Sequence, residues 1–211
     1  MESLNLSNPL VMVVIGLPGS GKSFFAGAFA QTFGAALVSR DKIRWTLFAH
    51  HTYSDNENTM TDQVSDLLIT ELFRTRKTFV LDGGYDTRVA RAELAAEARK
   101  AGFKVLTIIV QTDEPTSQRR AANRDARRSG DKYKQSLSAE EFAAQVKAHQ
   151  PPVIDKNTVV ISGKHTYQTQ VRTVLKKIIE TQGVKHDTAA PAAGTPGTRS
   201  PIARPRGPFV Q

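Results

Sequence analysis

The sequence predicts a three-layer α/β fold, in which a five-stranded parallel sheet carries helices on both faces. Two observations lead to this prediction. Five short apolar runs, most of them rich in valine and isoleucine, recur along the 211 residues, and each is followed by a longer segment of helical character. Such runs are typical of buried strands. A repeated strand–helix order requires parallel pairing with right-handed crossovers, and the length suits one domain with a substantial core.

The predicted strands are separated by glycine-containing or polar segments. They comprise residues 10–15, 35–38, 78–84, 104–110 and 159–161. The third run ends in an acid and two glycines, Asp82-Gly83-Gly84. In folds of this type ligands bind at the carboxyl ends of the strands. We therefore expect the functional residues in the loops that follow the strands.

Each predicted helix has a local signal. Gly34 and Gly102 are placed to stop the first and fourth helices, Pro115 opens a basic helix, and Ser138 with Glu141 forms a capping box. Apolar residues with helical spacing mark the longer segments. The predicted helices are residues 24–33, 42–48, 57–74, 87–101, a basic segment of about 116–136, 139–149 and 166–181.

The stretch GLPGSGKS joins the first strand to the first helix and matches the phosphate-binding pattern GxxxxGK(S/T), the P-loop. Its glycines let backbone N–H groups turn toward phosphates, Lys22 supplies charge to the β and γ phosphates, and Ser23 offers a hydroxyl to Mg²⁺. The sequence therefore predicts a P-loop NTPase fold with ATP and Mg²⁺ as cofactors. The expected nucleotide-binding residues are Gly16, Leu17, Pro18, Gly19, Ser20, Gly21, Lys22, Ser23 and Phe24.

Two acids lie at or just after the carboxyl ends of predicted strands. Asp82 ends an apolar strand, where P-loop proteins place the residue that holds Mg²⁺ directly or through water. The alternative is that Asp82 caps the following helix. Asp41, after the second strand, is the candidate general base for a substrate hydroxyl. Its alternative role is the N-cap of a helix beginning at Lys42.

The combination of GLPGSGKS, SRDKIR, VLDGGYDTRVAR and RRAANRDARR resembles the P-loop kinases of the polynucleotide kinase and zeta-toxin neighbourhood, over residues 10 to about 180. The resemblance implies that Asp41 activates the acceptor hydroxyl, that Arg44 lies near the acceptor, and that lid arginines close over the ATP phosphates. Gly83-Gly84-Tyr85 departs from the small polar residues found in many relatives, so the identity of the acceptor does not carry over. The expected acceptor-binding residues are Arg40, Arg44, Tyr85 and Arg88.

The basic segment is the predicted lid. Residues 119–134 contain seven Lys or Arg residues and two Asp residues, a local charge of +5. Arg120, Arg124 and Arg127 or Arg128 recur at helical spacing, so one face could direct guanidinium groups to one place. Together with Asp41 and Lys22, we expect Arg120, Arg124 and Arg128 to be catalytic. A solvated basic face and a nucleic-acid surface are the alternatives. Trp45, near Asp41, either packs or stacks on an acceptor base.

Composition sets the remaining expectations. The chain has no cysteine, a net charge of +9, no basic-then-apolar leader and no apolar run of membrane-spanning length. A soluble, cytoplasmic protein follows, with a monomer favoured and an acidic partner suited to the charge. We expect residues 1–183 to form the P-loop kinase domain. Residues 184–211, rich in Pro, Ala and Arg, are predicted to be a disordered basic tail.

Three functions fit these features. The favoured one is an ATP-dependent kinase that transfers the γ-phosphate to a hydroxyl of a small molecule or of a 5′-hydroxyl polynucleotide end. The second is a P-loop ATPase or nucleotide-dependent switch whose acceptor is water. The third is a nucleic-acid-binding protein that uses the fold as a scaffold. Only the first leaves the γ-phosphate on an organic acceptor.

Overall fold

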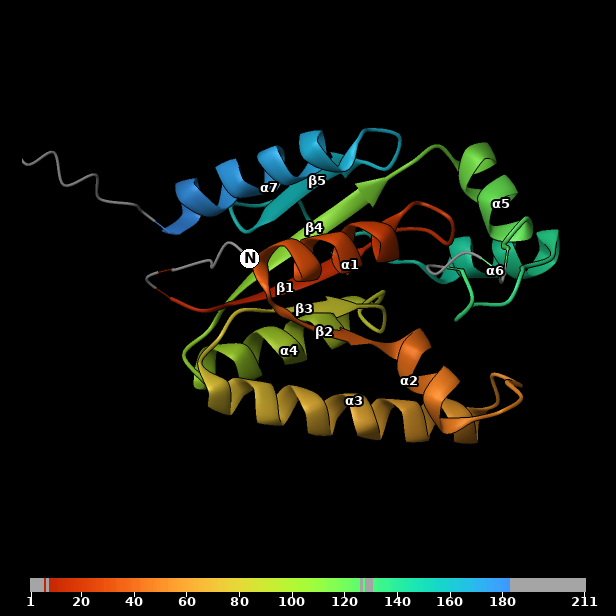
Figure 1. The fold of residues 1–211 in the computed structure, drawn as a ribbon, viewed down its shortest axis with the longest axis horizontal. Coiled ribbons are helices and arrows are strands. Elements are labelled where there is room, and N and C mark those ends of the chain that lie inside the picture. The colour runs from red at the N-terminus through yellow and green to blue at the C-terminus, as the bar shows by residue number, and fades with distance from the viewer. Residues whose placement is uncertain (1–5, 7, 126, 128–130, 183–211) are drawn as a thin grey trace, which may run out of the picture.

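A five-stranded parallel sheet forms the centre of the computed structural model, which describes residues 6, 8–125, 127 and 131–182 (Figure 1). The strand order is β2-β3-β1-β4-β5, and every neighbouring pair is parallel. The prediction of a five-stranded parallel sheet is confirmed. The strands are β1 (Leu10–Ile15), β2 (Ala36–Ser39), β3 (Phe79–Asp82), β4 (Lys104–Gln111) and β5 (Thr158–Ser162).

Helices cover both faces of the sheet, which confirms the three-layer α/β architecture. The side chains of β1 alternate between two cores: Leu10, Met12 and Val14 pack with α1 and α7, whereas Val11, Val13 and Ile15 pack with α3 and α4. Figure 1 shows α5 and α6 beyond the carboxyl ends of the strands. The helices are α1 (Lys22–Phe33), α2 (Arg40–Leu47), α3 (Asp55–Thr75), α4 (Arg88–Lys100), α5 (Glu114–Ala122), α6 (Ala139–Ala148) and α7 (Tyr167–Gln182).

The register of the strands aligns the ends of β2 and β3. Ser39, the last residue of β2, is the partner of Asp82, the last residue of β3. Val14 of β1 is also level with Asp82, so the P-loop that follows β1 begins near that carboxylate. Because β2, β3 and β1 are parallel, the loops that follow them lie at the same edge of the sheet. Ligands bind at this edge in folds of this type.

The predicted basic helix is wrong in its length. α5 ends at Ala122, and at Asn123 both the backbone N–H and the side-chain amide donate to the Arg119 carbonyl. An Asn side chain that satisfies a helix-end carbonyl favours termination there. Arg124 and Arg127 consequently lie beyond the helix, and Arg128 lies outside the described residues. The helical spacing expected for these arginines does not continue past Arg120.

Among the residues that the structure describes, no helix combines the length and the apolarity needed to cross a bilayer. The predicted tail, residues 184–211, lies outside the described part of the chain. The capping box of α6 is present as expected: the Ser138 hydroxyl accepts from the Glu141 N–H, and the Glu141 carboxylate accepts from the Ser138 N–H.

Candidate active site

The P-loop connects β1 to α1 through backbone conformations that require glycine. Gly19 has a φ of 77°, and a Cβ there would lie 2.1 Å from the carbonyl oxygen of Ser117. Gly21, the N-cap of α1, has a φ of 104° and provides no side-chain hydrogen bond to the first turn. The first N–H groups of a helix lack intrahelical partners and attract anions. The expected phosphate site is therefore built at the N-terminus of α1.

Lys22 begins α1 and folds back over the loop. Its Nζ donates a hydrogen bond of 3.2 Å to the Leu17 carbonyl oxygen. Burial, with the positive charge of Lys134 beside it, lowers the pKa of Lys22 to about 8. Both effects disfavour the charged ammonium, and phosphate oxygens would favour it. The side chain is thus poised to gain charge stabilisation when a phosphate group binds.

Asp82 is tied to the P-loop and not to the helix that follows it. Its carboxylate accepts hydrogen bonds from Ser23 Oγ (2.9 Å) and from Ser39 Oγ (3.2 Å), and the residue is only 4% exposed. Thr87 caps α4 instead, through a hydrogen bond from the Ala90 N–H. The structure therefore places Asp82 beside Ser23, where the two side chains could hold the same metal ion. The alternative prediction, that Asp82 caps the following helix, is wrong.

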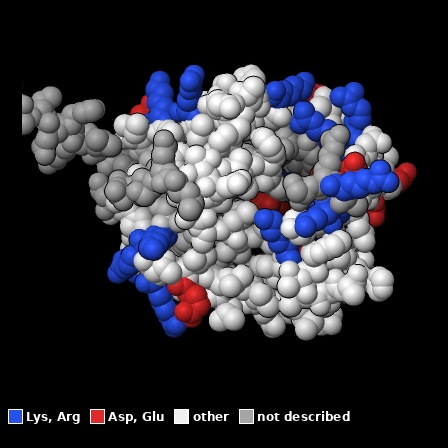
Figure 2. Space-filling model, viewed as in Figure 1, with Lys and Arg blue, Asp and Glu red and all other residues white. Residues whose placement is uncertain are grey.

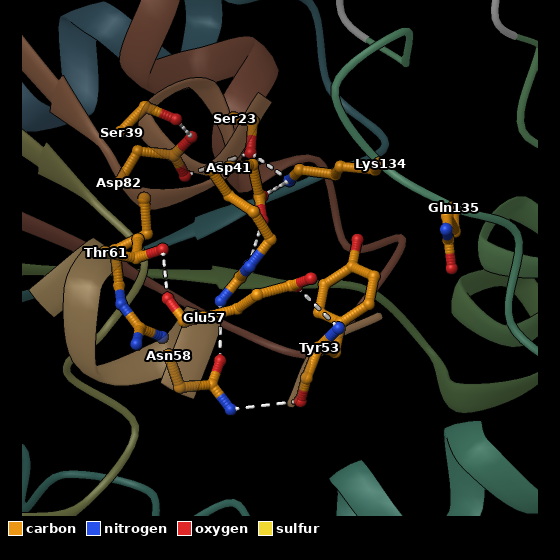
Figure 3. A network of polar contacts seen from close by, with 12 residues as sticks. Ser23, Ser39, Asp41, Tyr53, Glu57, Asn58, Thr61, Asp82, Lys134 and Gln135 are labelled. Atoms are coloured by element: carbon orange, nitrogen blue, oxygen red, sulfur yellow. Dashed lines mark hydrogen bonds and ion pairs between the residues drawn. The ribbon is translucent and has the colours of Figure 1, made fainter. Parts of the chain in front are cut away.

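Asp41 lies in the first turn of α2 and points toward the P-loop serine (Figure 3). Ser39 is the N-cap of α2, so the alternative role of Asp41 as that cap is also wrong. Burial opposes the ionisation of Asp41, but the ammonium groups of Lys134 and Lys22 outweigh it and hold the pKa of the carboxyl below its usual value. Asp41 is consequently a carboxylate at neutral pH.

Lys134 is the site residue that the sequence did not single out. Its Nζ lies 3.0 Å from Asp41 Oδ2 and donates a short hydrogen bond to Ser23 Oγ (Figure 3). Burial lowers the pKa of Lys134, but the charges of Asp41 and Asp82 outweigh it, and the net shift is upward. In the sequence, Lys134 was one of seven basic residues of the predicted lid. Its spacing from Ser23, 111 residues, offers no local signal.

The oxygens around Lys134 suit a hard cation. Ser23 and Asp41 both contact its ammonium group, and Asp82 accepts a hydrogen bond from Ser23; hydroxyl and carboxylate oxygens are the ligands that Mg²⁺ prefers. In the described part of the chain, no group of three or more His, Asp or Glu residues could hold a metal ion alone. A Mg²⁺ ion held by Ser23 and Asp82 would depend on phosphate oxygens for its remaining ligands. The expected metal residues therefore fit the ion.

The arginines of the predicted lid divide between two places. Arg120, at the end of α5, donates a hydrogen bond of 3.1 Å to the Gly163 carbonyl, in the turn after β5. Arg124 donates to the Gln135 carbonyl, next to Lys134. Burial lowers the pKa of Arg124, whereas the negative charge of Asp41 raises it, so this guanidinium lies within electrostatic reach of the site. The structure thus brings Arg124 toward Asp41 and directs Arg120 to the neighbouring turn.

The four expected acceptor-binding residues do not gather in one place. Arg40 and Tyr85 line a cavity between α3 and α4. Arg44 is 4% exposed, donates to Asn58 Oδ1 at 2.6 Å and lies over the Tyr53 ring at 4.5 Å. Arg88 is exposed at the start of α4 and does not line the cavity. Arg44 is accordingly buried beside the candidate base, with its Nη1 3.8 Å from Asp41 Oδ1, and Arg88 lies outside the cavity.

Aromatic side chains lie next to α2, on the side of the basic segment. Trp45 stacks on His51 with ring centroids 5.3 Å apart, and the ring of Tyr133 meets Trp45 edge-on at 6.0 Å. Trp45 therefore packs against His51 and Tyr133, although it remains 48% exposed.

Figure 2 shows Lys and Arg side chains gathered on the right of this view, around a recess in which acidic side chains are visible. The site thus combines a carboxylate pair with a surrounding positive surface.

A glycine-rich loop that leads from a central strand into a helix, with a serine bound to the acid that ends the next strand, defines a P-loop NTPase site. The chain belongs to the family described as an AAA domain, whose model matches residues 11–152. The expected P-loop NTPase fold is confirmed by this family and by the fold that the chain shares with solved structures. No curated protein matches the sequence.

Three solved structures illustrate the shared fold. A gluconokinase from Sinorhizobium meliloti is 18% identical, with a TM-score of 0.59, 83% of this chain and 94% of that chain covered. A sugar kinase from a Janibacter species is 13% identical, with a TM-score of 0.57 and coverage of 81% and 94%. Kti12 from Chaetomium thermophilum, in complex with ADP-AlF3, is 19% identical, with a TM-score of 0.60 and coverage of 82% and 98%. At these identities the likeness establishes the fold.

Proposed function

We propose that the chain is an ATP-dependent phosphotransferase that moves the γ-phosphate of ATP to a hydroxyl group of an organic acceptor. The observation that carries the proposal is the placement of Asp41: its carboxylate shares the Lys134 ammonium with Ser23 of the P-loop. A P-loop ATPase or switch needs no carboxylate for an organic hydroxyl at this position. The kinases of the same fold, and the nucleotide bound to Kti12, support the proposal.

The phosphates of ATP would lie in the glycine loop at the N-terminus of α1, where Lys22 meets the β and γ phosphates. When bound, Mg²⁺ would neutralise charge on the phosphates from the side of Ser23 and Asp82. Asp41 accepts the proton of the acceptor hydroxyl while that oxygen forms its bond to the γ-phosphorus. The bond between the γ-phosphorus and the bridging oxygen breaks, and ADP leaves with the electron pair. Atoms and charges balance with ATP and the acceptor alone.

Lys134 would change its partner during this reaction, from Asp41 to the γ-phosphate, and Arg124 would assist it. While Lys134 holds Asp41, the low pKa of that carboxyl makes it a weak base. If the ammonium moves to the γ-phosphate, the pKa of Asp41 rises toward its usual value and the carboxylate becomes a better proton acceptor. The guanidinium of Arg124, which is within electrostatic reach of Asp41, would be a second cation for the γ-phosphate. Cations that meet the spreading charge of the transferring group stabilise the transition state more than bound ATP.

Product analysis with ATP labelled at the γ-phosphate tests the proposal. The panel of acceptors comprises 5′-hydroxyl RNA and DNA, nucleosides, amino sugars and nucleotide sugars. We expect label on an organic acceptor, and we expect Asp41→Asn to lower that transfer by roughly 10²–10⁴ while ATP affinity changes by no more than about threefold. Release of label only as inorganic phosphate would identify an ATPase or switch. If Asp41→Asn transfers phosphate as fast as the original chain, Asp41 is not the general base.

A further inference from the structure

The cavity lined by Arg40 and Tyr85 lies between α3 and α4. Its volume is about 400 Å³, within the range of roughly 300–1,000 Å³ of small-molecule sites. The floor is apolar, because Val38, Ile69, Leu81 and Leu94 are buried side chains of the core between the sheet and these helices. The cavity therefore offers space and an apolar surface, independent of the glycine loop.

Four carboxylates stand on its two sides. Asp62 and Asp66 lie one helical turn apart on α3, and Glu93 and Glu97 have the same spacing on α4, so each pair lies on one helical face. Arg40 is the single basic residue of the lining, which gives the lining a formal charge of −3 in a chain whose net charge is +9. This concentration of negative charge runs against the character of the whole molecule.

Only one of the four carboxylates has a cationic partner. Arg40 pairs with Asp62 at 2.5 Å. Asp66, Glu93 and Glu97 make no ion pair or hydrogen bond through their carboxylates with the residues that the structure describes. Burial and the charge of Asp62 raise the pKa of Asp66, as expected of crowded carboxylates. An anionic ligand would meet three uncompensated negative charges, because the one guanidinium is already engaged.

A buried hydroxyl supplies an independent sign of a ligand. Ser65 lines the cavity between Asp62 and Asp66, is 6% exposed, and its Oγ has no hydrogen-bond partner in the described structure. Arg40 Nε, also in the lining, is buried and lacks a partner as well, but it is a donor that a protonated amine would not satisfy. A buried polar atom left without a partner costs roughly 1–3 kcal/mol, so native structures rarely leave one unless another group satisfies it.

We propose that this cavity binds a small organic cation that carries two or more amino groups separated by an apolar spacer. One amine would meet Asp66 on α3, the other would meet Glu93 and Glu97 on α4, and the spacer would cover the apolar floor. Ser65 Oγ would accept a hydrogen bond from the amine on its own side. The inference goes beyond phosphate transfer and does not depend on it.

Isothermal titration of the full chain without nucleotide tests the site, with 1,5-diaminopentane as the probe and pentane-1,5-diol as its uncharged analogue. We expect the diamine to bind at least about tenfold more tightly than the diol, since only the diamine offers charged amines to the carboxylates. The double change Asp66→Asn with Glu97→Gln should weaken the diamine by at least roughly tenfold. Glu180→Gln on α7, which removes an acid far from the cavity, should leave its affinity unchanged.

Ser65→Ala provides a second test that leaves the charge of the cavity unchanged. Removal of an unpartnered buried hydroxyl should leave the melting temperature the same or higher, whereas diamine affinity should fall by a factor of roughly three to ten. The proposal is overturned if the diol binds as tightly as the diamine, or if the diamine binds the double variant as tightly as it binds the original chain. Absence of heat from the diamine with the unaltered protein would overturn it equally.

Discussion

Lys134 gives the site a property that neither the P-loop nor Asp41 has alone. Its ammonium is bound to a hydroxyl of the P-loop and to the candidate base at the same time. The same charge lowers the pKa of Asp41 and, from the other side, lowers the pKa of Lys22. After burial, one side chain is therefore the largest influence on the ionisation of both the residue that would meet phosphate and the residue that would accept a proton.

Lys134→Met should move the acid limb of the activity profile to higher pH. Asp41 must be ionised to accept a proton, and its pKa rises when the ammonium that holds it down is removed. Profiles of kcat/KM against pH for both proteins provide the measurement. Lys132→Met is the matched control, because Lys132 lies two residues away and its ammonium stands over the Tyr133 ring. An acid limb that stays in place in Lys134→Met contradicts the coupling.

ATP affinity should depend on pH through Lys22. In the free protein the pKa of this side chain is about 8, so its ammonium is present below that pH and is lost above it. Phosphates favour the charged form, so binding takes up a proton above pH 8. We expect affinity to be level below the pKa and to fall above it, by at most roughly tenfold per pH unit. Titrations from pH 6 to pH 9 measure this, and Lys22→Ala should bind weakly without that fall.

At the scale of the elements, the segment after α5 decides how the basic residues act. α5 stops at Ala122, and the Leu137 N–H returns to the Ala121 carbonyl, so the chain between them leaves the helix and comes back to it. Lys134 reaches Ser23 of the P-loop from this excursion, and Arg124 lies within electrostatic reach of Asp41. Because Arg124 also donates to the Gln135 carbonyl, the two ends of the excursion are linked beside the site.

Arg124→Ala should lower kcat by roughly 10²–10⁴ and ATP affinity by less than about tenfold, if its guanidinium acts on the transferring phosphate. Arg127→Ala is the control: Arg127 is exposed, and its backbone N–H binds Asp125. Hydrogen exchange adds a second measurement. We expect amides of residues 131–137 to gain protection with an ATP analogue and Mg²⁺, and to gain less with ADP. Normal turnover by Arg124→Ala with unchanged exchange would reduce the segment to a basic surface.

The elements that could be predicted are those whose signals are local. The apolar runs, the glycine loop and the Ser138 capping box each follow from a few adjacent residues, and the sheet edge gathers Ser23 with Asp82 because parallel strands share a direction. Lys134 could not be predicted, because its place depends on the path of a loop. The end of α5 was missed because Asn123 outweighs a continuing basic pattern. The cavity acids were hidden within two ordinary amphipathic helices.

At the scale of the molecule, the two cores are built from the strands and from α1, α3, α4 and α7. Among the residues that the structure describes, the last buried apolar residue is Ile178. Truncation after Gly183 should leave the melting temperature and ATP affinity unchanged, because a tail rich in Pro, Ala and Arg is predicted not to join a core. Thermal unfolding and titration of the shortened chain check this. A drop of several degrees would show that the tail docks on the domain.

The central place of β1 has a consequence for synthesis on the ribosome. β1 is made before the other strands of this sheet, yet its neighbours are β3 and β4, which are made after three and four helices respectively. Until β3 and β4 emerge, both edges of β1, a strand of six consecutive apolar residues, are unpaired. β2 is made earlier, but it is not a neighbour of β1 in the sheet. Strands in that condition associate readily with other chains. A nascent chain arrested before β4 is thus the state most in need of a chaperone, and completion of β4 is the event that ends that need.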